Sequence, residues 1–460
     1  MTELAAADTV PFETAPGTAG PDIRGQRLAA ADYARNFSDM HPPLGRHEAL
    51  VESDRCYFCY DAPCQTACPT GIDIPLFIRK IGTGNVDGAA STIFEANILG
   101  GMCARVCPTE TLCEDACVRH TAEDRPVRIG LLQRYATDHF MQGHTSFGTR
   151  KAPTGKRVAV VGAGPAGLSC AHALASEGHD VTIFDARGKP GGLNEHGIAA
   201  YKAVGDFAQE EVDFILGIGG ITLEGGKALG RDLAIETLTA EFDAVFLGVG
   251  LQGVNALGLS GEAAAGVVDA VAWIEAMRQA EDKGNVPVGR RVVVIGGGMT
   301  AVDAAVQARK LGAEEVTMVY RRGEAAMNAS AFEREVARNA GVVIRTFARP
   351  AELHVAAGAV TGISFEKTVT DAEGRLTGTG ERFTLAADQV MKAIGQSFEP
   401  GPLGTIGLED GRIAVDAAFR TTNAKVWAGG DCVPAGEDLT VVAVEHGKRA
   451  ARSINAALKA

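Results

Sequence analysis

Eight of the ten cysteines lie between Cys56 and Cys117, and their spacing is suited to binding metal. The first four follow the pattern C-x2-C-x4-C-x3-C-P, and the second four begin at Cys103, with Pro108 directly after Cys107. Thiolates two to four residues apart fit a loop that wraps an iron–sulfur cluster, with a remote ligand completing it. Proline in such a loop fixes φ and removes a competing N–H. Structural zinc, which also takes four thiolates, and disulfides are the alternatives.

A glycine-rich turn after the cysteines predicts a nucleotide-binding module. Residues 156–185, KRVAVVGAGPAGLSCAHALASEGHDVTIFD, contain an apolar strand, a turn, a helix and a second strand that ends in Asp185. Gly162 permits the tight turn, Gly164 lets the backbone approach a pyrophosphate, and Gly167 packs the helix on the strand. The helix N-terminus would face the phosphates with its partial positive charge. Asp185 can accept hydrogen bonds from the adenosine ribose hydroxyls.

Residues 290–322, RRVVVIGGGMTAVDAAVQARKLGAEEVTMVYRR, repeat this plan. Gly296, Gly298 and Ala301 fill the fingerprint, but no acid ends the second strand. Arg321 and Arg322 stand there instead, and this is the chemistry expected for a 2′-phosphate. The two nucleotide modules also help to decide which metal centre the cysteines bind. A flavin in such a module needs a redox partner, and zinc is redox-inert, so the modules favour iron–sulfur clusters over zinc.

Length and charge limit the class of protein. A chain of 460 residues is too long for one core, so two or three domains are expected. The net charge of −13 argues against a nucleic-acid partner and against polybasic membrane docking. Neither a signal peptide nor an apolar run of 18 residues is apparent, so we expect a cytoplasmic protein with no membrane partner. In that reducing compartment clustered cysteines are more often metal ligands than disulfides. Cys170 and Cys432 stand alone and are expected to pack in the core.

Three motifs resemble the N-terminal iron–sulfur domain of dihydropyrimidine dehydrogenase: DAPCQTACPTGIDIPLFIRKI (61–81), GAASTIFEANILGGMCARVCPTETLCEDAC (88–117) and RPVRIGLLQRYATDHF (125–140). The wider family includes the small subunit of bacterial glutamate synthase, and the resemblance covers nearly the whole chain beyond residue 45. It implies two interleaved 4Fe–4S clusters. One would be bound by Cys56, Cys59, Cys64 and Cys117, and the other by Cys68, Cys107, Cys113 and Gln133, which leaves Cys103 as a bystander. Glutamate synthase small subunits usually carry Glu at the position of Gln133, so Gln133 favours the pyrimidine branch.

The resemblance assigns the first module to FAD. The segment WAGGDC (427–432) follows a strand and would meet the ribityl chain and pyrophosphate, and GGLNEHGIAAYK (191–202) resembles the loop beside the isoalloxazine ring. For Lys202, an ordinary surface lysine is the alternative. The residues expected to bind FAD are Gly162, Ala163, Gly164, Pro165, Ala166, Gly167, Asp185, Gly191, Gly192, Leu193, Lys202, Gly430 and Asp431.

The second module is expected to bind a nicotinamide nucleotide. Asn328 stands where NADPH-using relatives carry another Arg, and Met299 replaces the Asp or Asn common in the family. Both departures weaken the case for NADP, and the two-subunit bacterial enzymes that the chain resembles use NADH. We therefore expect NAD(H), with NADP(H) as the alternative. The binding residues would be Gly296, Gly297, Gly298, Ala301, Arg321, Arg322, Ala393 and Gly395.

The predicted fold class is α/β, with a helical iron–sulfur domain followed by two Rossmann-like domains, the NAD(P) domain being inserted in the FAD domain. The predicted boundaries are an N-terminal arm at 1–45, the helical domain at 46–150, the FAD domain at 151–286 and 393–460, and the NAD(P) domain at 287–392. Asp73 is a plausible N-cap within the helical part.

Together these features predict the electron-input subunit of dihydropyrimidine dehydrogenase. Hydride from NAD(P)H would reach FAD, and electrons would leave singly through the clusters. No barrel domain follows, so we expect an FMN-containing partner subunit that reduces uracil or thymine to the 5,6-dihydro form. The hydride step needs no acid or base, so no catalytic residue is predicted. Alternatives are a glutamate synthase small subunit, a stand-alone diaphorase or ferredoxin reductase, and a zinc-stabilised binding scaffold.

Overall fold

A computed structural model of the chain describes residues 22–371, 373–399 and 401–459. The chain divides into two compact units. The first comprises described residues of the ranges 22–39, 196–204 and 253–397. The second comprises described residues of 40–195, 205–252 and 398–459. Among the described residues, no helix combines the length and apolar character that crossing a membrane requires.

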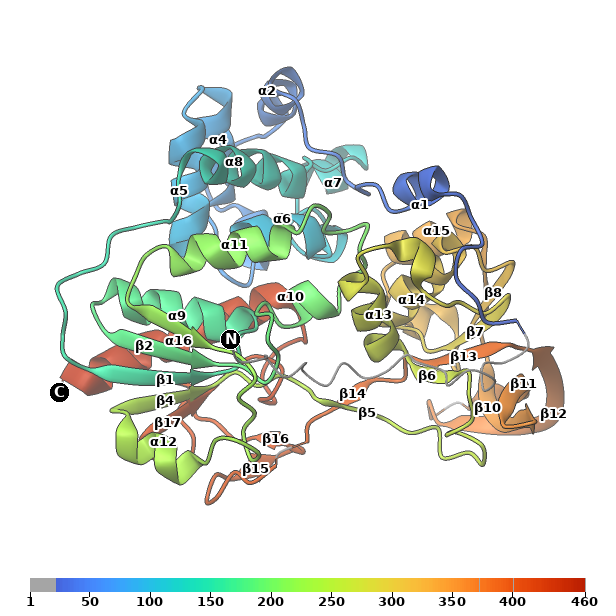
Figure 1. Cartoon of the computed structure of the whole chain (residues 1–460). Coiled ribbons are helices and arrows are strands. Elements are labelled where there is room, and N and C mark those ends of the chain that lie inside the picture. Colours follow the sequence, from blue (N-terminus) through green and yellow to red (C-terminus); the bar gives the residue numbers. More distant parts are fainter. Residues whose placement is uncertain (1–21, 372, 400, 460) are drawn as a thin grey trace. The chain divides into compact units, whose positions relative to one another are not determined.

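The cysteine-rich part of the second unit is helical, as the sequence predicted (blue and teal in Figure 1). Asp73 and Asn85 act as N-caps, accepting hydrogen bonds from the N–H groups of Leu76 (3.0 Å) and Gly88 (2.9 Å), which confirms Asp73 as a cap. The helices bury apolar faces in a shared core. They are α2 (Arg46–Asp54), α3 (Pro63–Ala67), α4 (Ile74–Gly82), α5 (Val86–Ala96), α6 (Gly100–Val106), η1 (Thr109–Thr111), α7 (Val118–Glu123) and α8 (Ile129–Gly143).

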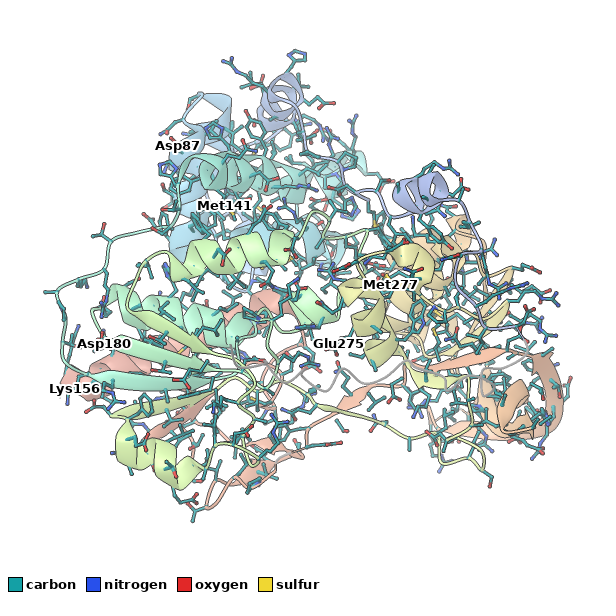
Figure 2. The ribbon with its side chains drawn as sticks, viewed as in Figure 1. Asp87, Met141, Lys156, Asp180, Glu275 and Met277 are labelled. Carbon is teal, nitrogen blue, oxygen red and sulfur yellow. The ribbon has the colours of Figure 1, made fainter. Side chains whose placement is uncertain are left out.

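The rest of the second unit is built on a parallel five-stranded sheet, in the order β17-β4-β1-β2-β3. Figure 2 labels Lys156 and Asp180 at the starts of β1 and β2, where the Asp180 N–H donates to the Lys156 carbonyl (2.9 Å). The strands are β1 (Arg157–Val161), β2 (Asp180–Phe184), β3 (Ile221–Glu224), β4 (Ala244–Leu247) and β17 (Val426–Ala428). The helices are α9 (Pro165–Ser176), α10 (Leu193–His196, whose last residue belongs to the first unit), α11 (Phe207–Leu216), α12 (Ile235–Glu241) and α16 (Thr440–Lys459), and a hairpin joins β15 (Leu408–Glu409) to β16 (Arg412–Ile413).

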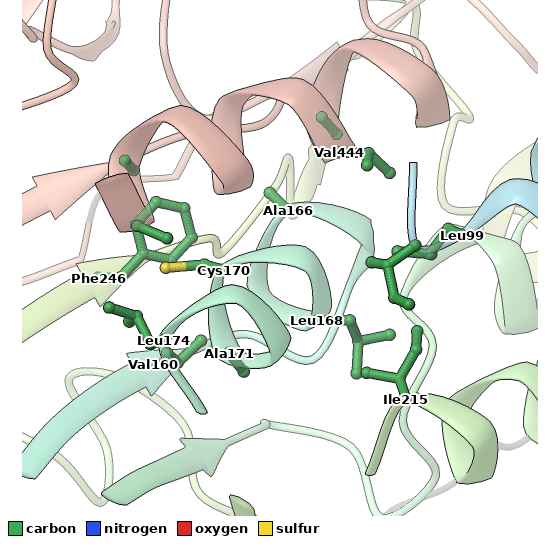
Figure 3. Close-up of a cluster of buried hydrophobic side chains, with 14 of the residues drawn as sticks. Leu99, Val160, Ala166, Leu168, Cys170, Ala171, Leu174, Ile215, Phe246 and Val444 are labelled. Carbon is green, nitrogen blue, oxygen red and sulfur yellow. The ribbon is translucent and has the colours of Figure 1, made fainter. Parts of the chain in front are cut away.

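Cys170 of α9 lies in the core of this unit, with side chains such as Phe246 and Leu174 around it (Figure 3). Cys432 is also buried. Both thiols therefore pack as small apolar side chains, as the sequence predicted.

The first unit contains a second parallel sheet, in the order β6-β13-β7-β8-β9. Its strands are β6 (Val267–Asp269), β7 (Arg291–Ile295), β8 (Glu315–Val319), β9 (Val342–Arg345) and β13 (Gln389–Lys392). An antiparallel sheet of β10 (Ala348–Ala356), β11 (Ala359–Thr370) and β12 (Leu376–Ala386) follows, and β5 (Gly253–Val254) pairs with β14 (Gln396–Ser397). The helices are α1 (Ala30–Asn36), α13 (Ala270–Gln279), η2 (Lys283–Asn285), α14 (Met299–Lys310), η3 (Glu324–Ala326) and α15 (Ala331–Asn339).

The boundaries of the two compact units differ from the predicted domain boundaries. Residues 253–286 join the first unit because β6 pairs with β13 within its sheet. Residues 22–39 join it too, through the Arg24–Val288 bridge and a hydrogen bond from Asn36 Nδ2 to the Lys310 carbonyl (2.8 Å). The rest of the predicted arm up to residue 21 lies outside the described residues. The helical region and the first sheet form one unit rather than two.

Candidate cofactor-binding sites

The first cysteine group lines one pocket. Cys56 follows α2, Cys59 lies in the next loop, Cys64 is in α3 and Cys117 precedes α7, and all four face the same space. Much of the remaining lining is apolar and includes Ile74, Ile78, Val127 and Ile129. Four thiols that converge in an apolar pocket fit the donor set and the water-poor surroundings of an iron–sulfur cluster. The structure thus brings together the four residues predicted to share one cluster.

The thiols of this pocket affect one another electrostatically. Burial raises the pKa of Cys56, and Cys117 and Cys59 raise it further. Burial and the same neighbours raise the pKa of Cys64 to about 12. The Phe58 N–H donates to Cys56 Sγ (3.4 Å), a contact of the kind that tunes a bound cluster. Four thiolates could not stay together here without a compensating cation, which a bound metal supplies.

The second group contains Cys68, Cys107 and Cys113, as predicted, but also Cys103. A hydrogen bond with Cys103, together with burial and the neighbouring Cys113 and Cys68, raises the pKa of Cys107 well above its ordinary value. The pKa of Cys113 is raised by burial, by Glu114, and then by Cys68 and Cys64. Because Cys113 interacts with Cys64 of the first group, the two groups are neighbours. This agrees with interleaved ligand sets.

Gln133 is buried on α8, where its Nε2 donates to the Gly100 carbonyl of α6 (2.7 Å). The carboxamide nitrogen is therefore occupied, and the oxygen is the atom left to bind iron. Cys103 lies on the same helix α6, in contact with Cys107. Cys103 thus contacts the second group, whereas Gln133 is held against α6, the helix that carries Cys103, and its role as the fourth ligand stays a prediction. The proximity of Cys103 to Cys107 follows from one helical turn, since α6 runs directly into Cys107.

The first glycine-rich turn has the geometry of a nucleotide cradle. Gly162 adopts φ +106, and a Cβ there would clash with the Gly248 carbonyl. A Cβ at Gly167 would clash with the Gly162 carbonyl, so Gly167 allows the close packing of α9 on the sheet. Gly164 is different, because a Cβ there would cause no clash: the nearest atom, the Cα of Gly192, would lie 3.7 Å from it. It leaves open space at the N-terminus of α9, where Pro165 and Ala166 begin the helix, and a pyrophosphate can approach there.

Several other predicted FAD residues surround this turn. Asp185 accepts hydrogen bonds from the N–H groups of Ala163 (2.6 Å) and Arg187 (2.8 Å), so its carboxylate braces the turn and each oxygen keeps a second lone pair. The Gly191 N–H donates to the Ala163 carbonyl (2.9 Å), and Gly192 packs against Gly164 just before Leu193 starts α10.

Gly430 and Asp431 reach the same turn from the C-terminal part of the chain. A Cβ at Gly430 would lie 3.0 Å from that of Ala166. Burial raises the pKa of Asp431 to about 6, and its carboxylate accepts no hydrogen bond from the described residues. A partly buried acid with free acceptors beside the fingerprint fits the ribityl hydroxyls of a flavin.

Lys202 is held between two carboxylates of the first unit. It belongs to the first unit and is almost fully buried, with Nζ 2.8 Å from Asp303 and 2.7 Å from Glu333. Burial alone would lower its pKa, but the two carboxylates raise it above its ordinary value. Lys202 is therefore a buried, doubly paired cation and not a surface lysine. Its place beside the flavin stays a prediction.

The second glycine turn also forms a cradle. A Cβ at Gly296 would clash with the Ala393 carbonyl, one at Gly297 would clash with the Tyr320 ring, and Gly298 faces open space before Ala301 in the first turn of α14. The Ala393 N–H donates to the Ile295 carbonyl (2.8 Å), and Gly395 adopts φ +100. The predicted nicotinamide residues of the two strand ends therefore meet at one edge of the sheet.

Arg321 and Arg322 are exposed beyond β8. Neither guanidinium forms a hydrogen bond or an ion pair with another described residue, so both are free to meet a ligand. Two further arginines near this loop share one carboxylate, because Arg334 (3.1 Å) and Arg338 (2.7 Å) both pair with Glu324. Asn328 is exposed in the same loop.

Sequence reasoning missed the carboxylates that hold buried groups in place. Asp303 and Glu333 bind Lys202, and Glu211 of α11 accepts from the Gly101 (2.8 Å) and Met102 (3.0 Å) N–H groups at the start of α6. Each partner is about a hundred residues or more away in sequence. No local pattern could have identified these pairs.

Two family models match the chain. One, described as dihydropyrimidine dehydrogenase domain II, 4Fe–4S cluster, matches residues 33–145. The other, described as pyridine nucleotide-disulphide oxidoreductase, matches residues 156–447. The solved structures of Mycobacterium tuberculosis FprA in complex with NADPH (TM-score 0.56) and of T. acidophilum thioredoxin reductase (TM-score 0.52) are each 20% identical to this chain. Each covers 66% of this chain, and 85% and 100% of their own chains are covered. At that identity they support the fold alone.

Curated relatives cover almost the full length. The NAD-dependent dihydropyrimidine dehydrogenase subunit PreT of Escherichia coli is 36% identical over 92% of this chain and 97% of its own. The glutamate synthase [NADPH] small chain of the same organism is 34% identical over 91% of this chain and 93% of its own. The chain is an NAD(P)H-dependent oxidoreductase that combines an iron–sulfur domain with a flavin and nicotinamide domain. It belongs to the family of iron–sulfur flavoprotein subunits that contains the dihydropyrimidine dehydrogenase subunit PreT and the glutamate synthase small chain.

Proposed function

We propose that this chain is the electron-input subunit of an NAD-dependent dihydropyrimidine dehydrogenase, located in the cytoplasm. The observation that carries the proposal is the pocket of Cys56, Cys59, Cys64 and Cys117 in the same compact unit as an open glycine cradle. One unit thereby holds the donors for a one-electron carrier and the cradle for a two-electron carrier. The 36% identity to a subunit of that enzyme supports the choice of pathway.

Each group of residues has a distinct role in the proposal. The first four thiols would hold one 4Fe–4S cluster, and Cys68, Cys107, Cys113 and Gln133 would hold a second. The turn from Gly162 to Gly167, with Asp431, would bind FAD. The turn from Gly296 to Ala301 would bind the nicotinamide nucleotide, and Arg321 and Arg322 would contact its adenosine end.

The chemistry that the bound groups would supply is hydride acceptance by the flavin and passage of single electrons through the clusters. The residues of this chain would bind the cofactors and orient them. Gly164 and Gly298 leave the space through which a pyrophosphate approaches the helix N-termini. The apolar side chains around the first four thiols keep water away from the cysteine sulfurs. No residue of this chain is needed to move a proton in the hydride step.

NADH is the proposed donor. Arg321 and Arg322 supply two free guanidinium groups, but Asn328 supplies no third charge. A charge-assisted hydrogen bond contributes about 1.5–3 kcal/mol, so loss of one contact would cost about one to two decades of affinity for a 2′-phosphate. The relatives are named for both donors, NAD for one and NADPH for the other.

The proposal is tested with the purified holoprotein and the FMN-containing dihydropyrimidine dehydrogenase subunit of the same organism. Alone, the chain should oxidise NADH with ferricyanide and leave uracil unchanged; mixed with the FMN subunit, it should produce dihydrouracil. Uracil reduction by the chain alone would contradict the two-subunit reading. Glutamate formation with a glutamate synthase large chain, in place of uracil reduction with the FMN subunit, would assign it to the other branch of the family.

A further inference from the structure

The segment CYFCY (56–60) carries two aromatic residues between the first two cysteines, Tyr57 and Phe58, and a third, Tyr60, directly after the second cysteine. Tyr60 is fully exposed, and Tyr57 is 52% exposed. Val118, directly after Cys117, is 39% exposed. Each of these apolar side chains is a sequence neighbour of a cysteine of the first pocket. We call Tyr57, Tyr60 and Val118 the cluster rim.

The cluster rim frames the cysteine pocket. Tyr57 and Val118 line that pocket together with the four thiols, and they are also exposed to solvent. A molecule that covered these two side chains would therefore be separated from the pocket by no more than one layer of side chains. Electron transfer between proteins needs such proximity, because tunnelling rates fall steeply with distance.

The Tyr57 ring is held in place although it is half exposed. The Arg119 guanidinium stacks over the ring at 4.1 Å, and the Tyr57 hydroxyl donates to Glu123 (2.8 Å). Arg119 in turn pairs with Glu123 (2.5 Å) and donates to the Arg55 carbonyl. A fixed aromatic side chain loses little conformational entropy when a partner covers it, so its burial adds to affinity.

The backbone of the loop determines which aromatic faces outward. Phe58 adopts φ +51, a left-handed conformation that costs about 1 kcal/mol or more for a residue with a side chain. Its ring packs on the core, with Arg79 4.8 Å away. With Phe58 turned inward, Tyr57 and Tyr60 on either side stay exposed. The packing of the fold does not explain an aromatic residue at position 60, because the Tyr60 side chain is fully exposed to solvent.

We propose that the cluster rim is the docking surface for the electron-accepting subunit of the complex, a protein with a redox group close to its own surface. This inference rests on the proposed function and names the surface through which it operates. Tyrosine is enriched at protein interfaces and at their energetic hot spots. Two relatives are named as a subunit and as a small chain of larger enzymes, so a partner of this kind is expected to cover part of the molecule. Each NADH oxidised supplies two electrons, which cross this surface one at a time, while the acceptor takes its protons from its own site or from water.

The test uses the holoprotein as wild type, Tyr60→Ser, Tyr60→Phe and Val369→Ser. Tyr60 is outside the pocket lining, so Tyr60→Ser should keep NADH–ferricyanide activity. Its Kd for the FMN subunit, measured by sedimentation, should rise at least about tenfold, and uracil reduction should fall at low partner concentration. Tyr60→Phe should retain most of the affinity because the ring remains. Val369, 49% exposed in the other unit, is the matched control and should bind as wild type does.

A second variant, Tyr57→Ser, tests the fixed ring, with iron content and the EPR spectrum showing whether the cluster pocket is intact. Wild-type affinity in Tyr60→Ser and in iron-replete Tyr57→Ser would overturn the proposal. Loss of self-association, in place of loss of partner binding, would also overturn it, because the rim would then join two copies of this chain. If the FMN subunit does not bind wild type, the proposed function fails, and the same variants are titrated with a glutamate synthase large chain. If the large chain binds wild type and the rim variants weaken that binding, the cluster rim is still the docking surface. If neither subunit binds wild type, the docking proposal is refuted.

Discussion

Replacing Lys202 with Met should destabilise the first unit, because it removes the buried cation that pairs with both Asp303 and Glu333. Met has a similar length and leaves two buried carboxylates facing each other. Breaking a buried ion pair by removing one partner costs about 3–5 kcal/mol. For a unit of this size, 1 kcal/mol corresponds to roughly 2–4 °C in Tm, so we expect Tm to fall by roughly 6–20 °C in that unit.

The difference in Tm between wild type and Lys202→Met should become smaller as the pH falls. Two carboxylates without a cation raise each other's pKa, so one of them takes up a proton in the folded variant. A raised carboxylate pKa favours folding at low pH, and this contribution is lost as pH rises. The gap in Tm between wild type and Lys202→Met should therefore narrow from pH 8 to pH 5.

Differential scanning calorimetry measures the change in Tm, and hydrogen exchange of residues 196–204 shows whether the loss of stability is local to the first unit. The triple variant Lys202→Met, Asp303→Asn, Glu333→Gln removes all three charges and should recover a large part of the loss. Lys156→Met is the matched control, because Lys156 is 43% exposed and forms a surface pair with Asp243 at 3.2 Å. Equal Tm values for wild type and Lys202→Met, or a deficit that does not change with pH, would refute this reasoning.

Three further outcomes follow from the sites. Asn328→Arg should raise kcat/KM for NADPH by about one to two decades with little change for NADH; a wild type that already prefers NADPH tenfold would contradict the role given to Asn328. Gln133→Ala should change the EPR signal of one cluster while Cys103→Ser leaves four ligands in place; the reverse pattern would make Cys103 the fourth ligand. Burial raises the pKa of Glu211 to about 8, so its protonated form stabilises the fold at low pH and this contribution is lost as pH rises through that value. The Tm advantage of Glu211→Gln over wild type should widen from pH 6 to pH 9, and a constant difference would show that Glu211 does not titrate there.

The nucleotide turns could be predicted because their geometry is local. In GAGPAG, the contact of Gly162 with Gly248 is not local, whereas the φ of +106 at Gly162 and the close approach of Gly167 to the Gly162 carbonyl are local features. The same holds for the helical cap at Asp73 and for the buried thiol of Cys170. Short-range patterns of this kind are read directly from residue type and spacing.

The unit boundaries could not be predicted in the same way. The short strand at 267–269 has no distinctive pattern, and only its pairing with β13, more than a hundred residues later, assigns residues 253–286 to the first unit. Strand pairing is a long-range choice made by the whole sheet.

The sequence by itself determined the chemistry: eight clustered cysteines and two glycine fingerprints specify which cofactors suit the chain, because ligand type and turn sterics reside in neighbouring residues. Only the tertiary structure decided which side chains that are distant in sequence lie in contact and which stay exposed. It brought Cys117 to Cys56, enclosed Lys202 between Asp303 and Glu333, and left Tyr60 in solvent. Burial and ion pairing depend on which distant segments pack together, and that is settled by the free energy of the whole fold rather than by any local pattern.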